Sequence, residues 1–393
     1  MLKPSRSSGA GALNKICMVK MMQNQILQLF PLDSSLLQEI LSLVFYGFFF
    51  LYMFFGNSIQ TRRILLSLSG ALNKVKGARD KSKKEVLDYL QKNGYKGDAS
   101  LQVDNLIEFF TIAPVSLDPA GLVKKIEHLL SVRDERVREE VKKLLPDKDV
   151  ITTSITENLL DTSAALNYYY KVLRHYYLVG KKTSNIYLLM QLQIILPEIL
   201  REIDALMSSI DPIKNAQPMG DGIGAMVAAK LMLNSEKKPI ARDTVFAEVK
   251  YKNRVLYVMK AEGPAGNVGA VGNAVERLIN SYGLKPALIV MIDAALKLEG
   301  EPTGEIAEGV GAAIGGIGVD KFKIEEISSK ANIPLYAIII KESIGEAISA
   351  MTKDIIDAAA KTQARLDSLI EDRTKEGDVI IVVGVGNTLG VGQ

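Results

Sequence analysis

The stretch PALIVMIDAALKLEGEPTGEIAEGVGAAIGGIG, residues 286–318, decides how the second half of the chain is interpreted. Its apolar run, Ala287 to Ile292, follows Pro286 and ends at Asp293. A short apolar run with turn signals nearby is typical of a strand that is buried on both faces. An aspartate at the carboxyl end of such a strand lies where open α/β sheets bind their ligands. The segment 304–318 has too many glycines for an ordinary helix or strand, so we expect it to form the wall of a site.

The same pattern continues on both sides of this stretch, throughout residues 211–393. Apolar runs alternate with helical patterns, and this alternation predicts an α/β domain with a largely parallel sheet. The predicted strands are 244–251, 254–261, 287–294, 334–341 and 378–385, and the predicted helices are 225–233, 273–282, 323–331 and 343–370.

Two aspartates in this half are the candidate catalytic residues. Asp221 lies in the glycine-rich turn GDGIG, residues 220–224, which opens a helix, and Asp293 ends the apolar strand. A helix cap explains Asp221 equally well, and a turn residue explains Asp293. The flanking glycines favour a site, because a simple cap does not need them.

Two further glycine-rich loops follow predicted strands, at 262–269 and 384–387. Loops that follow the strands of a parallel sheet meet at one edge, so we expect them to surround the two aspartates. Their backbone amides also suit a phosphate or nucleotide, although Asp221 would repel an anion unless a cation such as Mg²⁺ intervened. The predicted loop residues are Gly220, Gly222, Gly224, Gly263, Gly266, Gly384, Gly386 and Asn387.

The order of motifs over about residues 215–393 resembles the spore germination protease family, whose fold is similar to that of hydrogenase maturation proteases. In that family one aspartate lies in a turn ahead of a helix and a second ends a strand in an Ile-Asp-Ala motif, and Asp221 and Asp293 match these positions. The resemblance implies a peptidase whose two carboxylates share a proton. The matching segments are GDGIGAMVAAKL (220–231), EGPAGNVG (262–269), AVERLINSYGLKPALIVMIDA (274–294), GVGAAIGGIGV (309–319) and IPLYAIII (333–340).

Two departures from that family are visible. The family's turn aspartate follows a strand that ends in Gly-x-Gly-Asn, whereas here VIIVVGVGN stands at 379–387, so the resemblance implies a circular permutation. Hydrogenase maturation proteases use a histidine as a metal ligand, and residues 215–393 contain none. We therefore expect no metal of that type and no cofactor. As a whole, the chain resembles an uncharacterised archaeal membrane-protein family, domain of unknown function 1512, which implies no activity.

The first half begins with the apolar segment LLQEILSLVFYGFFFLYMFF, residues 36–55. It predicts a transmembrane helix over 36–56, since roughly 20 apolar residues span a bilayer core. A buried helix is rarely so aromatic and apolar all round, and no convincing cleavage site for a signal peptide follows. The basic residues after the segment place the C-terminal bulk of a single-pass cell-membrane protein in the cytoplasm. They are Arg62, Arg63, Lys74, Lys76, Arg79, Lys81, Lys83 and Lys84.

The remaining first half is expected to be an N-terminal segment, residues 1–35, and a helical cytoplasmic domain, residues 57–210. Met18, Met21 and Met22 are alternative starts in the weakly patterned N-terminal segment. Tyrosines at 168–177, interleaved with basic residues, suit single-stranded nucleic acid, but at helical spacing we expect them to pack between helices. A net charge of +3 gives no nucleic-acid footprint.

Composition narrows the chemistry and leaves three functions open. The single cysteine excludes an internal disulfide and a multi-cysteine metal site, and both histidines lie before residue 176, which excludes a Ser-His-Asp triad within the C-terminal half. The open functions are a membrane-anchored peptidase acting on a peptide or protein, a phosphate- or nucleotide-binding module, and a non-catalytic membrane-tethered interaction protein. A homo-oligomer is compatible with each of them.

Overall fold

The structure is a computed structural model that describes residues 35–392 except 115–118 and 316–317. The first half of the chain is helical, as predicted. The N-terminal segment and its alternative starts, residues 1–34, lie outside the described part. The helices of the first half are α2 (Ser35–Lys92), α3 (Ser100–Ile107), α4 (Pro119–Leu144), α5 (Val150–Thr183) and α6 (Ile186–Lys214).

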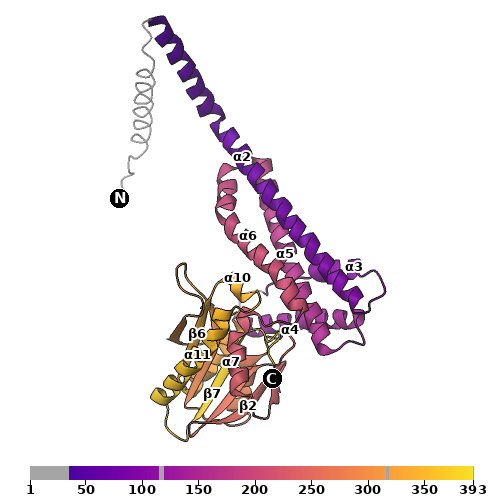
Figure 1. Cartoon of the computed structure of the whole chain (residues 1–393), viewed down its shortest axis with the longest axis vertical. Helices are drawn as coiled ribbons and strands as arrows, with labels where there is room; N and C mark the ends of the chain where they lie inside the picture. The colour runs from indigo at the N-terminus through magenta and orange to yellow at the C-terminus, as the bar shows by residue number, and fades with distance from the viewer. Residues whose placement is uncertain (1–34, 115–118, 316–317, 393) are drawn as a thin grey trace.

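Helices α2, α5 and α6 pack side by side and form the core of the helical half (Figure 1). α2 contributes Ile64 and Leu68 to this core, and α6 contributes Leu189 and other leucines. Gly180 of α5 lets this helix lie close to α6, because a Cβ at that position would lie 2.3 Å from Leu189 Cδ2. The tyrosines of α5 are shared between this packing and the surface: Tyr169, Tyr170 and Tyr177 pack against the core, whereas Tyr168 and Tyr176 are exposed.

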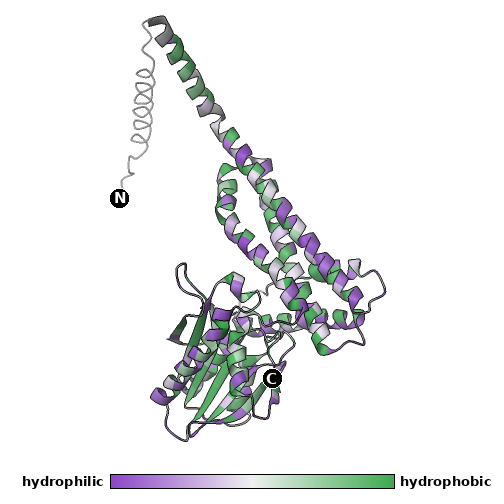
Figure 2. Cartoon of the chain, in the orientation of Figure 1, coloured by the Kyte–Doolittle hydropathy of each residue, from purple (hydrophilic) through white to green (hydrophobic). Residues whose placement is uncertain are grey.

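The N-terminal part of α2 extends beyond this bundle as an apolar arm, which comprises residues 40–53 (Figures 1 and 2). Leu43, Phe48 and Tyr52 of the arm are 71–76% exposed. Among the described residues, no single helix is both long and apolar enough to cross a membrane. One pair of segments, Glu39–Met53 and Ser58–Lys92, meets the criteria of length and composition together, with a bend of 53° between them. The transmembrane helix predicted over 36–56 is therefore not confirmed.

The second half of the chain is built on a seven-stranded mixed sheet in the order β1-β2-β3-β7-β4-β6-β5. The four neighbouring strands β3, β7, β4 and β6 are parallel, so the prediction of a largely parallel sheet is confirmed. β1 and β2 extend one edge antiparallel, and β5 extends the other. The strands are β1 (Lys238–Ala241), β2 (Thr244–Tyr251), β3 (Arg254–Ala261), β4 (Leu288–Leu296), β5 (Ile306–Val310), β6 (Leu335–Glu342) and β7 (Val379–Gly384).

Helices cover both faces of the sheet. Residues of α7 and α11 pack on one face, where Ile223, Val227 and Ile370 join the strand residues Val290 and Ile338 in one core. Residues of α8 and α9 pack on the opposite face in a second core. The elements are η1 (Gly220–Gly222), α7 (Ile223–Leu231), α8 (Val271–Asn280), α9 (Val319–Ala331), α10 (Ile344–Ala347) and α11 (Lys353–Arg373).

Two expectations for this half are wrong. The glycine-rich segment 304–318 was expected to contain no strand, but it includes β5, which pairs antiparallel with β6 as a partly exposed edge strand. An edge strand needs a partner on one side only, so it lacks the apolar run that marks a central strand. The single helix expected at 343–370 is two helices, because residues 348–352 turn away and Ala350 pairs with Met219.

The last strand of the chain, β7, occupies the middle of the sheet between β3 and β4. Its residues Ile380, Ile381, Val382 and Val383 are fully buried, which accounts for their uninterrupted apolar character. This position brings the C-terminal loop, residues 385–391, to the carboxyl edge of the sheet beside the turn at Asp221.

Candidate functional site

β4 carries Asp293 to the carboxyl edge of the sheet, where the side chain is 5% exposed. Asp293 Oδ1 accepts a hydrogen bond of 2.8 Å from the backbone N–H of Ala294. Burial, and after it the negative charge of Asp221, raise the pKa of Asp293 to about 8. This environment favours the protonated form of the Asp293 carboxyl group.

Asp221 reaches the same edge from the short turn η1, directly before α7. Its Oδ2 accepts a hydrogen bond of 3.1 Å from the backbone N–H of Asn387, in the loop after β7. Burial raises the pKa of Asp221, and the Asn387 amide opposes this shift by stabilising the charged form. Asp221 is therefore held by a residue from the far end of the chain.

The glycines beside Asp221 let the start of α7 lie directly on the sheet. A Cβ on Gly224 would be 2.2 Å from the carbonyl oxygen of Ile292, so any larger residue would push α7 away from β4. Gly386 has a φ of +120°, and a Cβ there would be 1.9 Å from the Asp221 carbonyl oxygen. These contacts explain why the turn is rich in glycine. A helix cap alone would not require these glycines.

Asp221 and Asp293 line one cavity of about 310 Å³. Asp320, at the start of α9, lines it too and accepts a hydrogen bond of 2.7 Å from the Gly272 N–H. The helical half contributes Leu130 of α4 to the same wall. Further lining residues are Val268, Gly269, Ala294, Ile314, Gly315, Gly318, Val319, Val385 and Gly386.

Glu342, the last residue of β6, is a further carboxylate at this edge that the sequence analysis missed. It is 1% exposed, and neither carboxylate oxygen has a hydrogen-bond partner within the described residues. It lies beneath the Asp221 turn, since a Cβ on Gly220 would be 2.8 Å from Glu342 Oε2. Burial, with the charges of nearby carboxylates and of Asp221 first among them, raises the pKa of Glu342 to about 8. The missed signal was an acidic residue ending an apolar run, as at Asp293.

The predicted loop residues divide between the cavity and the packing around it. Of these eight residues only Gly386 lines the cavity. Gly263 packs against the C-terminal loop, where a Cβ would be 1.9 Å from the Val391 carbonyl oxygen, and Gly384 packs against Ala228 of α7. Gly266 and Asn387 both lie beside Asn158 of α5, whose side chain donates to the Gly266 carbonyl oxygen at 3.3 Å. Gly220 and Gly222 pack against α10 and the Asn387 carbonyl respectively.

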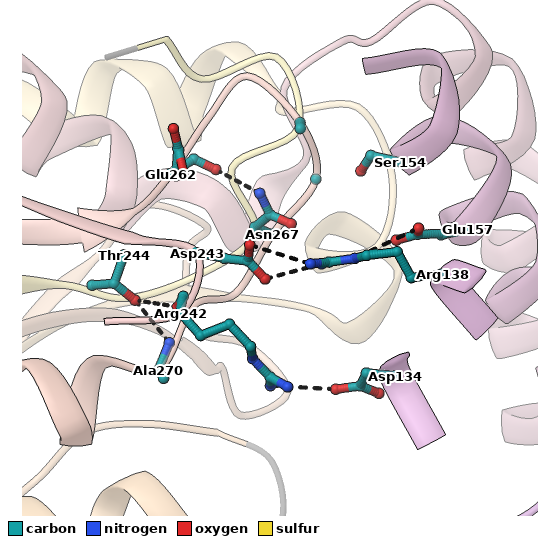
Figure 3. Close-up of polar contacts among 12 residues, drawn as sticks. Asp134, Arg138, Ser154, Glu157, Arg242, Asp243, Thr244, Glu262, Asn267 and Ala270 are labelled. Carbon is teal, nitrogen blue, oxygen red and sulfur yellow. Dashed lines mark hydrogen bonds and ion pairs between the residues drawn. The ribbon is translucent and has the colours of Figure 1, made fainter. Parts of the chain in front are cut away.

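A second cleft, also of about 310 Å³, adjoins this cavity, and Leu130, Val268 and Gly269 line both. It lies between the helical half and the sheet half and is lined by charges of both signs (Figure 3). Arg138 of α4 donates to both carboxylate oxygens of Asp243, at 2.9 and 3.4 Å, and lies 3.8 Å from Glu157 of α5.

A second pair crosses the same boundary, since Arg242 of the sheet half approaches Asp134 of α4 at 3.5 Å (Figure 3). Within the helical half, Arg133 of α4 donates to Asp161 of α5 at 2.9 Å. Burial raises the pKa of Glu157 to about 7. This network keeps α4, and with it Leu130, against the mouth of the carboxylate cavity.

The chemistry available at the cavity is acid–base chemistry by carboxyl groups. Residues 219–392 contain no histidine and no cysteine. Within the described part of the chain, no three His, Cys, Asp or Glu side chains are grouped so that they could hold a metal ion. Desolvated carboxyl groups with raised pKa values, such as Asp221, Asp293 and Glu342, are typical of groups that exchange protons near neutral pH.

Two family models together cover nearly all of the described chain. One, described as Protein of unknown function (DUF1512) N-terminal domain, matches residues 42–216, and the other, Domain of unknown function (DUF1512) C-terminal, matches residues 219–392. The chain therefore belongs to the DUF1512 family. No curated protein and no solved structure matches it. The resemblance to germination proteases thus stays a prediction from short motifs.

Proposed function

We propose that this DUF1512 protein is a membrane-tethered peptidase in which Asp221 and Asp293 share a proton. The proposal is carried by one observation: two aspartates from separate elements line the same cavity, and the charge of one raises the pKa of the other. Two nearby carboxyl groups do not readily ionise together, so one serves as a base while the other serves as an acid.

The charges favour one assignment of these roles. The negative charge of Asp221 raises the pKa of Asp293, so Asp221 is the ionised partner and Asp293 keeps the proton. Asp221 takes a proton from water as the water oxygen bonds to the peptide carbonyl carbon. Asp293 donates its proton to the leaving nitrogen as the C–N bond breaks. The two groups have then exchanged protonation states, and a proton transfer through water restores them.

The charge of the cavity favours this function over phosphate binding. Asp221, Asp293 and Asp320 all line it, and Glu342 lies just beneath. An anionic ligand would meet carboxyl groups and no cationic side chain among the lining residues, whereas a peptide bond carries no net charge. The backbone amides at the glycine loops do not offset this, because several of them already donate to Thr388, Asp221 or other loop atoms.

The membrane tether is supported by the arm. Its apolar side chains are exposed over residues 40–53, and Arg62 and Arg63 follow it. An exposed apolar segment of this kind is costly in water and suits a bilayer. By the positive-inside rule, the basic residues then place the carboxylate cavity on the cytoplasmic side.

The test is cleavage of a mixed peptide library by the purified full chain, analysed by mass spectrometry. Asp221→Asn and Asp293→Asn should each reduce cleavage by about 10²- to 10⁴-fold, because each removes a general acid or base. Both changes keep an oxygen that can accept the existing amide hydrogen bond, so the fold should persist.

Asp320→Asn is the matched control, since it removes a charge from the same cavity and retains the acceptor for the Gly272 N–H. It should leave most of the cleavage intact. Cleavage at the unaltered rate by either of the two aspartate variants would contradict the proposal. A chain that cleaves no peptide but co-purifies with a stable partner would support the non-catalytic interaction protein instead.

A further inference from the structure

Basic residues without acidic neighbours in the sequence gather at one end of the helical half. Residues 40–79 of α2 contain five Lys or Arg and no Asp or Glu, and residues 162–197 of α5 and α6 contain four and none. By contrast, α4 alone contains seven basic and five acidic residues. The hairpin formed by the end of α5 and the start of α6 is therefore a surface of one sign.

Ion pairs fix how far this hairpin extends along α2. Lys74 of α2 pairs with Asp204 of α6 at 2.7 Å, and Glu85 pairs with Lys214 at 2.7 Å, so the two helices run in the same direction. Ile186 lies 18 residues before Asp204, and position 56 of α2 lies 18 residues before Lys74. Since both helices rise about 1.5 Å per residue, α6 begins within about two turns of the end of the arm. Figure 1 shows the hairpin tip beside α2 at this level.

The tip of the hairpin exposes aromatic and basic side chains together. Tyr187 of α6 is 78% exposed, and Tyr176 and Leu178 of α5 are also exposed. Lys181 and Lys182, in the last turn of α5, are exposed between them. Tyrosine is favoured at the level of lipid headgroups, and Lys side chains are attracted to an anionic membrane surface.

We propose that the tip of the α5–α6 hairpin, residues 176–190, binds the surface of an anionic lipid bilayer beside the arm. The inference rests on the proposed tether and adds a second point of attachment to it. Two attachments on a rigid bundle fix the orientation of the helical half relative to the membrane. Because ion pairs across the second cleft join the helical half to the sheet half, the orientation of the carboxylate cavity is then fixed as well.

A single-stranded nucleic acid is the other partner that basic and aromatic side chains suit. The bilayer is favoured because the tip lies at the same end of the molecule as the exposed arm, where headgroups would surround it. A nucleic acid at this position would have to compete with the anionic surface for the same lysines.

The chain contains no tryptophan, so one introduced indole reports its own surroundings. The full chain with Tyr187→Trp is reconstituted into vesicles of phosphatidylcholine, with or without anionic phosphatidylglycerol, whose acyl chains carry bromine. Bromine quenches an indole that lies at the headgroup boundary. We expect strong quenching in anionic vesicles and weaker quenching in neutral ones or at high salt. The reference is Phe110→Trp, at a site that is 72% exposed and follows α3, a helix that lies at the other end of the helical half from the arm (Figure 1).

Two double charge reversals complete the design. Lys181→Glu with Lys182→Glu should remove most of the difference in quenching between positions 187 and 110. Lys92→Glu with Lys96→Glu makes the same change of charge near the opposite end of α2 and should leave that difference unchanged.

Vesicle flotation separates this inference from the tether on which it rests. A chain that floats with vesicles while the indole at 187 is quenched no more than the one at 110 would overturn the docking and leave the tether standing. A chain that floats with neither kind of vesicle would overturn both. An indole at 187 that responds to a single-stranded oligonucleotide and not to anionic vesicles would also overturn the docking.

Discussion

The carboxylate cavity and the adjoining cleft share a wall, but only the cleft pairs its carboxylates with cations. In the cleft, Arg133, Arg138 and Arg242 each form an ion pair with a carboxylate. In the cavity, neither Asp221 nor Asp293 forms an ion pair with any described residue, and the same holds for Glu342 beneath them. Removing a carboxylate from water without a compensating cation is costly. A site whose buried carboxylates have no paired cation is suited to proton transfer. A site whose carboxylates are paired with arginines is suited to holding two parts of the molecule together.

Burial raises the pKa of carboxyl groups in both regions, so the difference between the regions lies in whether a nearby cation opposes this shift. Burial raises the pKa of Glu157 in the cleft to about 7, even though Arg138 lies 3.8 Å away and lowers it. Asp293 and Glu342, without a nearby cation, reach about 8. The cavity should therefore respond most strongly to pH, and the cleft to the loss of an arginine.

The largest effect on stability is expected from Glu342→Gln at alkaline pH. The pKa of Glu342 is 4.5 in its ordinary environment and about 8 in the folded chain, so the folded chain binds more protons between these values. Its stability therefore falls as the pH rises through this range, and the total loss reaches roughly 2–4 kcal/mol once the pH exceeds 8. Gln cannot ionise, so the variant should be more stable than the unaltered chain at pH 9 and similar to it at pH 5.

Amide hydrogen exchange of the buried strand β7 measures this difference, with the two chains compared at the same pH. Glu305→Gln is the control, because Glu305 is an exposed residue that pairs with Lys341. It should show no gain in stability at pH 9. Equal exchange rates for the Glu342→Gln and unaltered chains at pH 9 would mean that another group compensates the charge of Glu342.

The sequence analysis identified Asp293 as a site residue but missed Glu342. Each ends an apolar run, but Asp293 was supported by a motif resemblance and Glu342 was followed by an ordinary helix pattern. The parallel core was predictable because buried strands have uninterrupted apolar runs. The edge strand β5, with its exposed glycine and valine, has no such run.

The cleft could not be predicted from the sequence at all. Arg138 and Asp243 are 105 residues apart, and each has the appearance of an ordinary surface charge. Only the packing of α4 and α5 against the loops of the sheet brings them together. The position of Asn387 beside Asp221 was predicted, because a loop after a central parallel strand must reach the same edge as Asp293.

A smaller effect is expected from Arg138→Ala in the cleft. The change leaves Asp243 and Glu157 without their shared cation, and we expect a loss of about 1–3 kcal/mol, since the pair is only partly buried. The loss should appear as faster amide exchange in α4 and in the loop 262–269. Arg136→Ala, on the same helix but paired only with Glu140, should cost less than about 0.5 kcal/mol.

The smallest effect is expected from Arg242→Ala, and it tests whether the cleft acts as one network. The Arg242–Asp134 pair is 3.5 Å long and more than 40% exposed on both sides, so it should contribute less than about 0.5 kcal/mol. Amide exchange in α4 should therefore be nearly unchanged. If Arg242→Ala instead costs as much as Arg138→Ala, the charges of the cleft are coupled, and the double variant will lose less than the sum of the two. Independent losses would mean that Arg138 and Arg242 join the two halves separately and not as one network.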